Sequence, residues 1–348
     1  MRYPQKLASA VGALLLAAGI VPASSAALPA PAAAPAAAQA TVIAQPDIYQ
    51  RFYSATQPAT TAECEAALGF ACYEPAQFQA AYNVEPLFSH GITGTGETIV
   101  IVDAFGSPTI ATDLSTFDAT FGLPNPPSLN IIQPAGSVTF DPTDPGDLNW
   151  AGETTLDVEW SHVMAPGADI LLVETPVNET EGTAGFPQIV EAENYVVDHH
   201  LGDVISQSFG ATEETFPSPL SILALRSAYI NAYLHGITVL AATGDAGATD
   251  YANVAGTLLY PFRVVDWPAT DPLVTAVGGT KLTLDANGNR LYPDVVWNDT
   301  YNPAVLEAFT GSTTPTPLAG SGGVSAVFSR PSLIRCTSTR RGRSNVCS

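Results

Sequence analysis

The stretch from Gly152 to His162 has the sequence GETTLDVEWSH, and the helix-stopping pair Pro166-Gly167 follows it. As a helix, it places the carboxyl groups of Glu153 and Asp157 on one face, one turn apart. An adjacent apolar stripe can pack on a sheet and consists of Leu156, Trp160 and Val163. On a solvated face two such acids merely repel, whereas a buried pair shares one proton over a range of acidic pH. The stretch is therefore either a solvated acidic face or a pair able to take up and return a proton.

Short apolar runs alternate with helical patterns on both sides of this stretch. The expected strands are 98–103, 170–174, 204–208, 238–242 and 273–277. The expected helices, besides the central one, are 111–121, 187–199 and 220–235. This alternation indicates an α/β fold with a mainly parallel sheet and helices on both faces. Function in such sheets gathers at the carboxyl ends of the strands, and Asp103 and Asp245 both stand at or just past such ends.

The composition of the 348-residue chain is strongly acidic. It has 12 Lys and Arg against 33 Asp and Glu, and a formal net charge of −21. This charge argues against nucleic acid and anionic membranes as partners. It suits a protein that works in acid, where protonation brings the net charge nearer to zero.

The N-terminus has the features of an export signal. Basic residues Arg2 and Lys6 precede an apolar run from 7 to 21 and a small-residue cleavage site at 24–26. We therefore expect a signal peptide over 1–26 and a secreted, extracellular protein. An Ala/Pro-rich linker over 27–40 follows, and then an N-terminal segment over 41–95 with room for a short propeptide.

Two of the four cysteines, Cys64 and Cys72, lie close together near the start of the expected mature protein. In an oxidising compartment they are expected to form a short-loop disulfide. Their spacing fits no metal site, and we expect no metal ligands in this chain.

Three further motifs follow the Glu153/Asp157 helix in order. They are AATGDAGA at 241–248, VTAVGGT at 274–280 and GSGGVSAVFSRPS at 320–332. Together the four resemble the sedolisin family of serine-carboxyl peptidases, over roughly residues 62–332. The resemblance implies a subtilisin-like domain over 96–334 that acts on protein or peptide substrates as an endopeptidase at acidic pH. We also expect a monomer.

The same resemblance implies roles for three carboxyl groups. Glu153 would be the general base that accepts the serine proton, and Asp157 would orient Glu153 and share its proton. Asp245 would be the oxyanion-hole residue, which must be protonated to donate a hydrogen bond to the developing oxyanion. These roles agree with work in acid, because a carboxylate base stays ionised at a pH where histidine holds its proton.

An ordinary Ser-His-Asp subtilase is the alternative that Asp103 raises, because a strand-end Asp can serve as the acid of that triad. That alternative needs a His-Gly-Thr-His-type segment. None of the five histidines stands in one, the five being His90, His162, His199, His200 and His235. Asp103 is therefore interpreted as structural. Glu159 is interpreted as a solvated or structural carboxylate, because it points elsewhere on the helix than Asp157.

The nucleophile is where the sequence departs from the family. Family members carry a Gly-Thr-Ser-Ala turn downstream of the Phe-x-Arg-Pro motif and an Asp-rich calcium loop near the end of the domain. Neither is present in this sequence, so calcium is expected only for the full-length family domain. Ser325 is the remaining candidate nucleophile, although it precedes Phe328-Ser-Arg-Pro331 instead of following it.

The tail over 335–348 differs from the rest of the chain. It holds four of the 12 basic residues, two of the four cysteines and no acidic residue. We expect a reading-frame shift or a mistaken gene end just after Ser332, with a native basic tail as the alternative. The expectation is thus an incomplete family peptidase that is inactive as it stands. The rival is a non-catalytic secreted protein on a peptidase scaffold.

Overall fold

The structure is a computed structural model that describes residues 58–179, 185–253, 257–331, 336–337 and 346–347. The chain divides into two units, 1–39 and 40–348, and the described residues belong to the second. The expected signal peptide and almost all of the expected linker fall in the first unit, outside the described residues. Within the expected tail, β11 (Cys336–Thr337) and β12 (Val346–Cys347) are described as an antiparallel pair.

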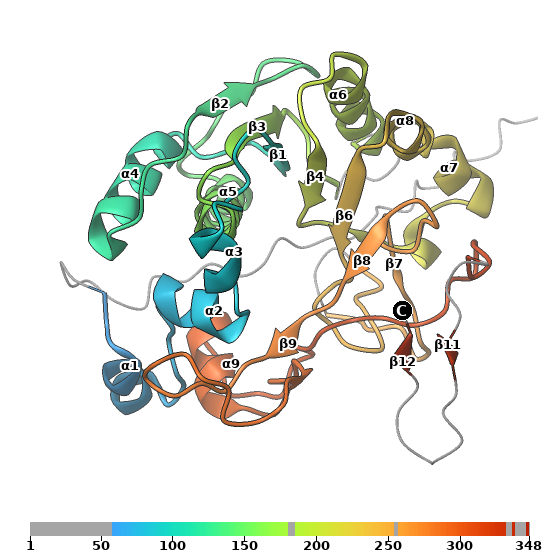
Figure 1. The fold of residues 1–348 in the computed structure, drawn as a ribbon. Helices are drawn as coiled ribbons and strands as arrows, with labels where there is room; N and C mark the ends of the chain where they lie inside the picture. The colour runs from blue at the N-terminus through green and yellow to red at the C-terminus, as the bar shows by residue number, and fades with distance from the viewer. Residues whose placement is uncertain (1–57, 180–184, 254–256, 332–335, 338–345, 348) are drawn as a thin grey trace, which may run out of the picture. The chain divides into compact units, whose positions relative to one another are not determined.

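The main sheet has six strands in the order β2-β3-β1-β4-β6-β8, and each neighbouring pair is parallel. Figure 1 shows their arrangement. The strands are β1 Thr98–Ala104, β2 Leu129–Ile132, β3 Asp169–Thr175, β4 Val204–Gln207, β6 Thr238–Ala242 and β8 Thr275–Val277. The predicted parallel α/β sheet is therefore confirmed. The sequence did not predict β2, which is short and has no buried residue.

Helices cover both faces of the sheet, as predicted. Val100 and Val102 of β1 point toward α6 (Phe186–Asp198) and α8 (Ser227–His235). Ile101, on the opposite face, packs with α4 (Ile110–Phe121) and α5 (Pro145–Met164). Because side chains alternate along a strand, Asp103 shares the α5 face with Ile101.

Two helices differ from the prediction. α5 begins at Pro145, before the stretch from Gly152 on which the helix was predicted, because Asp144 caps it and accepts a 2.7 Å hydrogen bond from the Gly146 amide. The single helix expected over 220–235 is two helices, α7 (Pro219–Ala224) and α8. They are separated at Leu225 and Arg226, where Asp271 binds the guanidinium group of Arg226.

The N-terminal helices pack on the domain that follows them. They are α1 Thr61–Leu68, α2 Pro75–Ala81 and α3 Glu85–Ser89, and a disulfide joins Cys64 to Cys72. The side-chain amide of Gln79 donates a 2.9 Å hydrogen bond to the backbone carbonyl of Val163 at the end of α5. The Tyr73 hydroxyl accepts one of 3.0 Å from the Leu284 amide. This segment is thus built into the same packing as the sheet.

The remaining elements are short. β5 (Ala211–Thr212) pairs antiparallel with β7 (Asp266–Trp267), and β9 (Thr280–Lys281) pairs with β10 (Val295–Val296). The turn η2 (Glu213–Thr215) follows β5, and α9 spans Pro303–Thr310. Because β5 comes just after β4, the β5–β7 pair and η2 lie at the carboxyl edge of the main sheet, where function was expected.

Candidate active site

The α5 helix presents both predicted catalytic acids on its inner side. Glu153 is buried and only 4% exposed, and Asp157, one turn later, is half-buried. Their neighbours Thr154 and Val158 are fully buried, so this face points at the sheet. The solvated-face interpretation is therefore wrong for Glu153.

The predicted apolar stripe of α5 is partly wrong. Leu156 is 43% exposed, because the helix turns Thr154 and Val158 toward the sheet in its place. Val163 is buried as expected. Trp160 packs sideways on Phe78 of α2, with ring centroids 4.5 Å apart, so it fastens the N-terminal segment to α5.

Asp103 lies beside these acids at the carboxyl end of β1. It is 1% exposed, and burial raises the pKa of its carboxyl group well above the usual range. The charge of Asp157 raises this pKa further, whereas the Thr154 hydroxyl lowers it. Asp103 therefore belongs to the same electrostatic unit as Asp157, a proximity that the sequence interpretation of Asp103 did not include.

Asp245 stands in the turn after β6, at the same edge of the sheet. Since β6 is two strands from β1, the two strand ends are about 10 Å apart. The turn is shaped by Gly244, whose φ of +97° favours glycine. Its backbone is fixed, because the Ala319 amide donates a 2.6 Å hydrogen bond to the Asp245 carbonyl. The two predicted proton-transfer acids, Glu153 and Asp157, and the predicted oxyanion residue, Asp245, thus lie at the same carboxyl edge of the sheet.

A second acidic pair lies beneath this turn and was missed from the sequence. A Cβ built on Gly244 would meet Oδ2 of Asp266 at 2.1 Å, so that carboxyl group fills the space under the turn. Burial raises the pKa of Asp266 well above its usual range, and the charge of Asp250 adds to the shift. Asp250 in turn accepts a 3.1 Å hydrogen bond from the Thr212 hydroxyl. Their signal in the sequence is faint, because Asp266 follows an apolar run of only two residues, Val264 and Val265, and Asp250 follows none.

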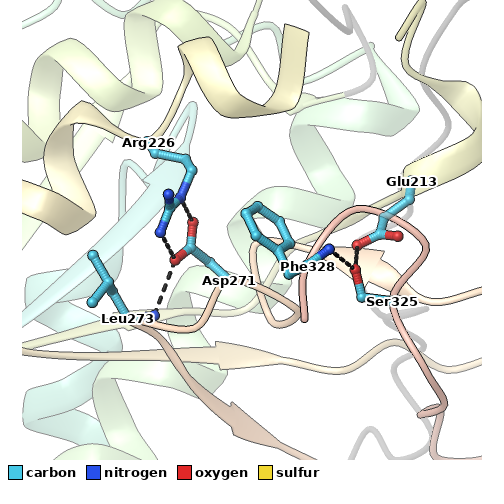
Figure 2. A network of polar contacts seen from close by, with 6 residues as sticks. All are labelled: Glu213, Arg226, Asp271, Leu273, Ser325 and Phe328. Carbon is cyan, nitrogen blue, oxygen red and sulfur yellow. Dashed lines mark hydrogen bonds and ion pairs between the residues drawn. The ribbon is translucent and has the colours of Figure 1, made fainter. Parts of the chain in front are cut away.

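Ser325 is engaged elsewhere, as Figure 2 shows. Its hydroxyl donates a 2.6 Å hydrogen bond to Oε1 of Glu213. The hydroxyl oxygen of Ser325 also accepts hydrogen bonds from the backbone amides of Val327, at 3.0 Å, and Phe328, at 2.7 Å. A hydroxyl has one proton and two lone pairs, so these three bonds use its full capacity. Such a hydroxyl is held as a structural group and is not free to attack a substrate.

The histidines do not assemble a subtilase triad around Asp103. His162 is fully buried in the last turn of α5, with Nε2 2.6 Å from the Pro124 carbonyl and 3.4 Å from Oδ1 of Asp118. The other four are exposed: His90, His199, His200 and His235. Near His162, burial raises the pKa of Glu159 to about 8, and the charges of Asp113 and Asp118 contribute. Glu159 therefore belongs to an α4–α5 cluster and not to the face of Glu153.

Over the described ranges, no group of three or more acidic, histidine or cysteine side chains could hold a metal ion. None of the helices in those ranges is long and apolar enough to cross a membrane.

The chain matches no family model, but several known proteins are similar to it. Kumamolisin from Bacillus sp. (strain MN-32) is 33% identical over 264 residues, covering 75% of this chain and 41% of kumamolisin. Sedolisin from Pseudomonas sp. (strain 101) is 28% identical over 275 residues, covering 78% of this chain and 42% of sedolisin. The chain thus spans less than half the length of these two relatives.

A solved structure gives the same result. Pseudomonas sedolisin, a serine-carboxyl proteinase complexed with two molecules of pseudo-iodotyrostatin, superimposes with a TM-score of 0.57 and 26% identity. The match covers 75% of this chain and 65% of that one. It confirms the subtilisin-like α/β fold that the motifs implied. By its fold, its motifs and its relatives, the chain belongs to the sedolisin family of serine-carboxyl peptidases.

Proposed function

We propose that the protein is a secreted serine-type endopeptidase that hydrolyses peptide bonds of proteins or peptides at acidic pH. The observation that carries this proposal is the position of Glu153, buried on α5 next to Asp157, at the carboxyl edge that Asp245 shares. Relatives that are serine-carboxyl peptidases support the same chemistry.

In the proposed mechanism Glu153 accepts the proton of a serine hydroxyl as that hydroxyl attacks the peptide carbonyl carbon. Asp157 orients Glu153 and shares its proton. Asp245, in its protonated form, donates a hydrogen bond to the oxyanion of the tetrahedral intermediate. Glu153 then returns the proton to the leaving amine. Each of these groups acts in acid, because Asp245 must be protonated while Glu153 must still be able to accept a proton.

We further propose that this chain does not turn over peptides by itself. The support is the saturated hydroxyl of Ser325, the one nucleophile candidate of the sequence. We place the calcium ion expected for the full-length family domain outside the described residues. The acidic charge supports a protein without nucleic-acid or membrane partners, and we propose a monomer.

The test has two arms. In the first, the gene is resequenced through the codon for Ser332 and translated in all three frames. We expect another frame to continue into a Gly-Thr-Ser-Ala turn and an Asp-rich loop. In the second, the present chain and that extended product are each assayed on casein at acidic pH, and only the extended product should cleave it.

The peptidase proposal is wrong for this product if every frame closes without the turn and the present chain does not cleave casein. The non-catalytic scaffold then takes its place. Cleavage by the present chain that is lost in Ser325→Ala, and is not restored in Ser325→Thr, would instead make Ser325 the nucleophile.

A further inference from the structure

The segment Ala319–Phe328, which we term the strap, runs beside the turn that presents Asp245. Its first residues bond to that turn on both sides. The Ala319 amide donates to the Asp245 carbonyl at 2.6 Å, and the Gly247 amide donates to the Ala319 carbonyl at 2.9 Å. The Ser321 amide donates to the Gly244 carbonyl at 2.9 Å. The backbone position of Asp245 therefore depends on where the strap lies.

The middle of the strap is held by the carboxylate of Glu213, which is 6% exposed. Its Oε1 accepts the Ser325 hydroxyl at 2.6 Å, and its Oε2 accepts the Ala326 amide at 2.8 Å, as drawn in part in Figure 2. Both side-chain oxygens of this buried residue are therefore occupied by the strap. Glu213 itself is anchored, because its amide donates to the Val265 carbonyl at 3.0 Å.

The end of the strap is fixed by a different pair. The guanidinium carbon of Arg226 lies 5.0 Å from the centre of the Phe328 ring. Asp271 holds Arg226 through two hydrogen bonds of 2.5 and 2.9 Å and also accepts a 3.0 Å bond from the Leu273 amide. Figure 2 shows this pair on one side of Phe328 and Glu213 on the other.

Between the turn and Glu213 the strap is rich in glycine, with Gly320, Gly322 and Gly323. Glycine has the largest backbone freedom to lose, so this stretch does not hold one conformation by itself. The Gly320 amide is held by the Trp297 carbonyl at 3.0 Å, and the two bonds from Ser325 and Ala326 to Glu213 constrain the chain beyond Gly322 and Gly323. Removing them would leave the strap free between its bonds to the turn and its contact at Phe328.

We propose that Glu213 is a positioning residue for Asp245, acting through Ser325 and the strap. The inference rests on the proposed role of Asp245 as the oxyanion donor. It gives Ser325 a purpose other than that of nucleophile. An oxyanion donor is effective only within a few tenths of an ångström of its target position, so a loosened strap would weaken the reaction without removing a reacting group.

Hydrogen exchange tests this without requiring activity. The rates are measured at the amides of Gly247, Ala319 and Ser321 in Glu213→Ala, Ser325→Ala and Ser325→Thr. The two alanine variants should exchange about tenfold faster at these three amides, since the hydrogen bonds lost in each variant are together worth about that factor. The threonine variant keeps the hydroxyl and should exchange as the parent does.

The matched control is Ser128→Ala. Ser128 donates a 2.5 Å hydrogen bond to Asp169, and both lie at the opposite, amino edge of the sheet. This variant should leave the three amides unchanged. Unchanged exchange in Glu213→Ala, in a protein with native near-ultraviolet circular dichroism, would overturn the proposal. If Glu213→Ala does not fold, Glu213→Gln keeps one acceptor oxygen and must show an intermediate rate, and parent-like exchange in it also overturns the proposal.

Steady-state kinetics on casein provide a second test, in the extended product that is expected to cleave it. There Glu213→Gln should lower kcat severalfold and leave KM nearly unchanged, because it acts on the transition state. A raised KM with kcat intact would contradict positioning of Asp245. If no form cleaves casein, the peptidase function fails, while the exchange result still decides whether Glu213 holds the strap and the turn.

Discussion

Glu193 on α6 gives the sharpest link between pH and stability. It is 1% exposed, and burial raises the pKa of its carboxyl group to about 8. The amide nitrogen of Gln207 donates a hydrogen bond to its Oε1, while Oε2 of Glu193 and Oε1 of Gln207 have no partner. A proton on Oε2 could bond to that Gln207 oxygen and satisfy both. The folded protein therefore favours the neutral acid.

The direction in which pH changes stability follows from comparing the protons bound by Glu193 in the folded and unfolded states. The unfolded chain loses this proton near pH 4.5, whereas the folded chain keeps it up to about pH 8. Between these values the folded state binds one more proton, so its stability falls as pH rises, by about 1.4 kcal/mol per pH unit. The total loss between pH 4.5 and 8 is on the order of 5 kcal/mol from this residue.

We predict that Glu193→Gln removes this loss, because an amide cannot ionise and still fits beside Gln207. Urea unfolding from pH 4 to 8 measures it. The variant and the parent should have similar free energies of unfolding at pH 4, and the variant should be more stable at pH 8 by several kcal/mol. Glu191→Gln, at an exposed position on the same helix, is the control. Parallel pH profiles for the parent and Glu193→Gln would refute the reasoning.

Three other outcomes follow from the structure. In the casein-cleaving form of the protein, Glu153→Gln should lower kcat at least a hundredfold. The control Glu159→Gln should change kcat by less than about threefold. Initial rates of casein cleavage at acidic pH measure both. Gly244→Ala should cost more than about 2 kcal/mol in urea unfolding, because its φ is +97° and the added Cβ meets a carboxylate at 2.1 Å. Gly236→Ala, with a φ of +75° and open space around it, should cost about 1 kcal/mol. Cys64→Ser should cost about 2–3 kcal/mol in the same assay by removing the disulfide.

The parts of the fold that could be predicted from the sequence are those whose pattern of apolar residues is clear, above all the buried strands. Residues 98–103 form an apolar run that ends in Asp103, and β1 occupies that run with one residue more. β6 coincides with the predicted 238–242. Buried parallel strands read as continuous apolar runs, so their sequence identifies them.

The missed parts depend on contacts between distant residues. β2 is added at the sheet edge by pairing with β3, and its LNII sequence has no buried residue to announce it. The break between α7 and α8 is fixed by Asp271, 45 residues beyond Arg226. The early start of α5 was readable in principle, because Asp144 followed by Pro145 is a helix-start signal that the surrounding prolines obscured.

The candidate site shows the same division. Glu153 and Asp157 were found because their partner is one helical turn away. The proximity of Asp103 to Asp157 required the register that lays α5 across the end of β1. Glu213 and Asp266 were missed because each contacts a segment that is distant in the sequence, and elements of two or three residues have no sequence pattern.

The proposed activity in acid and the expected stability in acid have one physical origin, the burial of carboxyl groups. Burial raises the pKa values of Glu159, Glu179 and Glu193 to about 8, and those of Asp103 and Asp266 rise as well. Each of these groups penalises the folded state once the medium favours ionisation. In the proposed mechanism Asp245 must be protonated, and the surrounding fold already favours the protonated form of several buried acids. A neutral-pH version of this site would need changes throughout the core, and not at Asp245 alone.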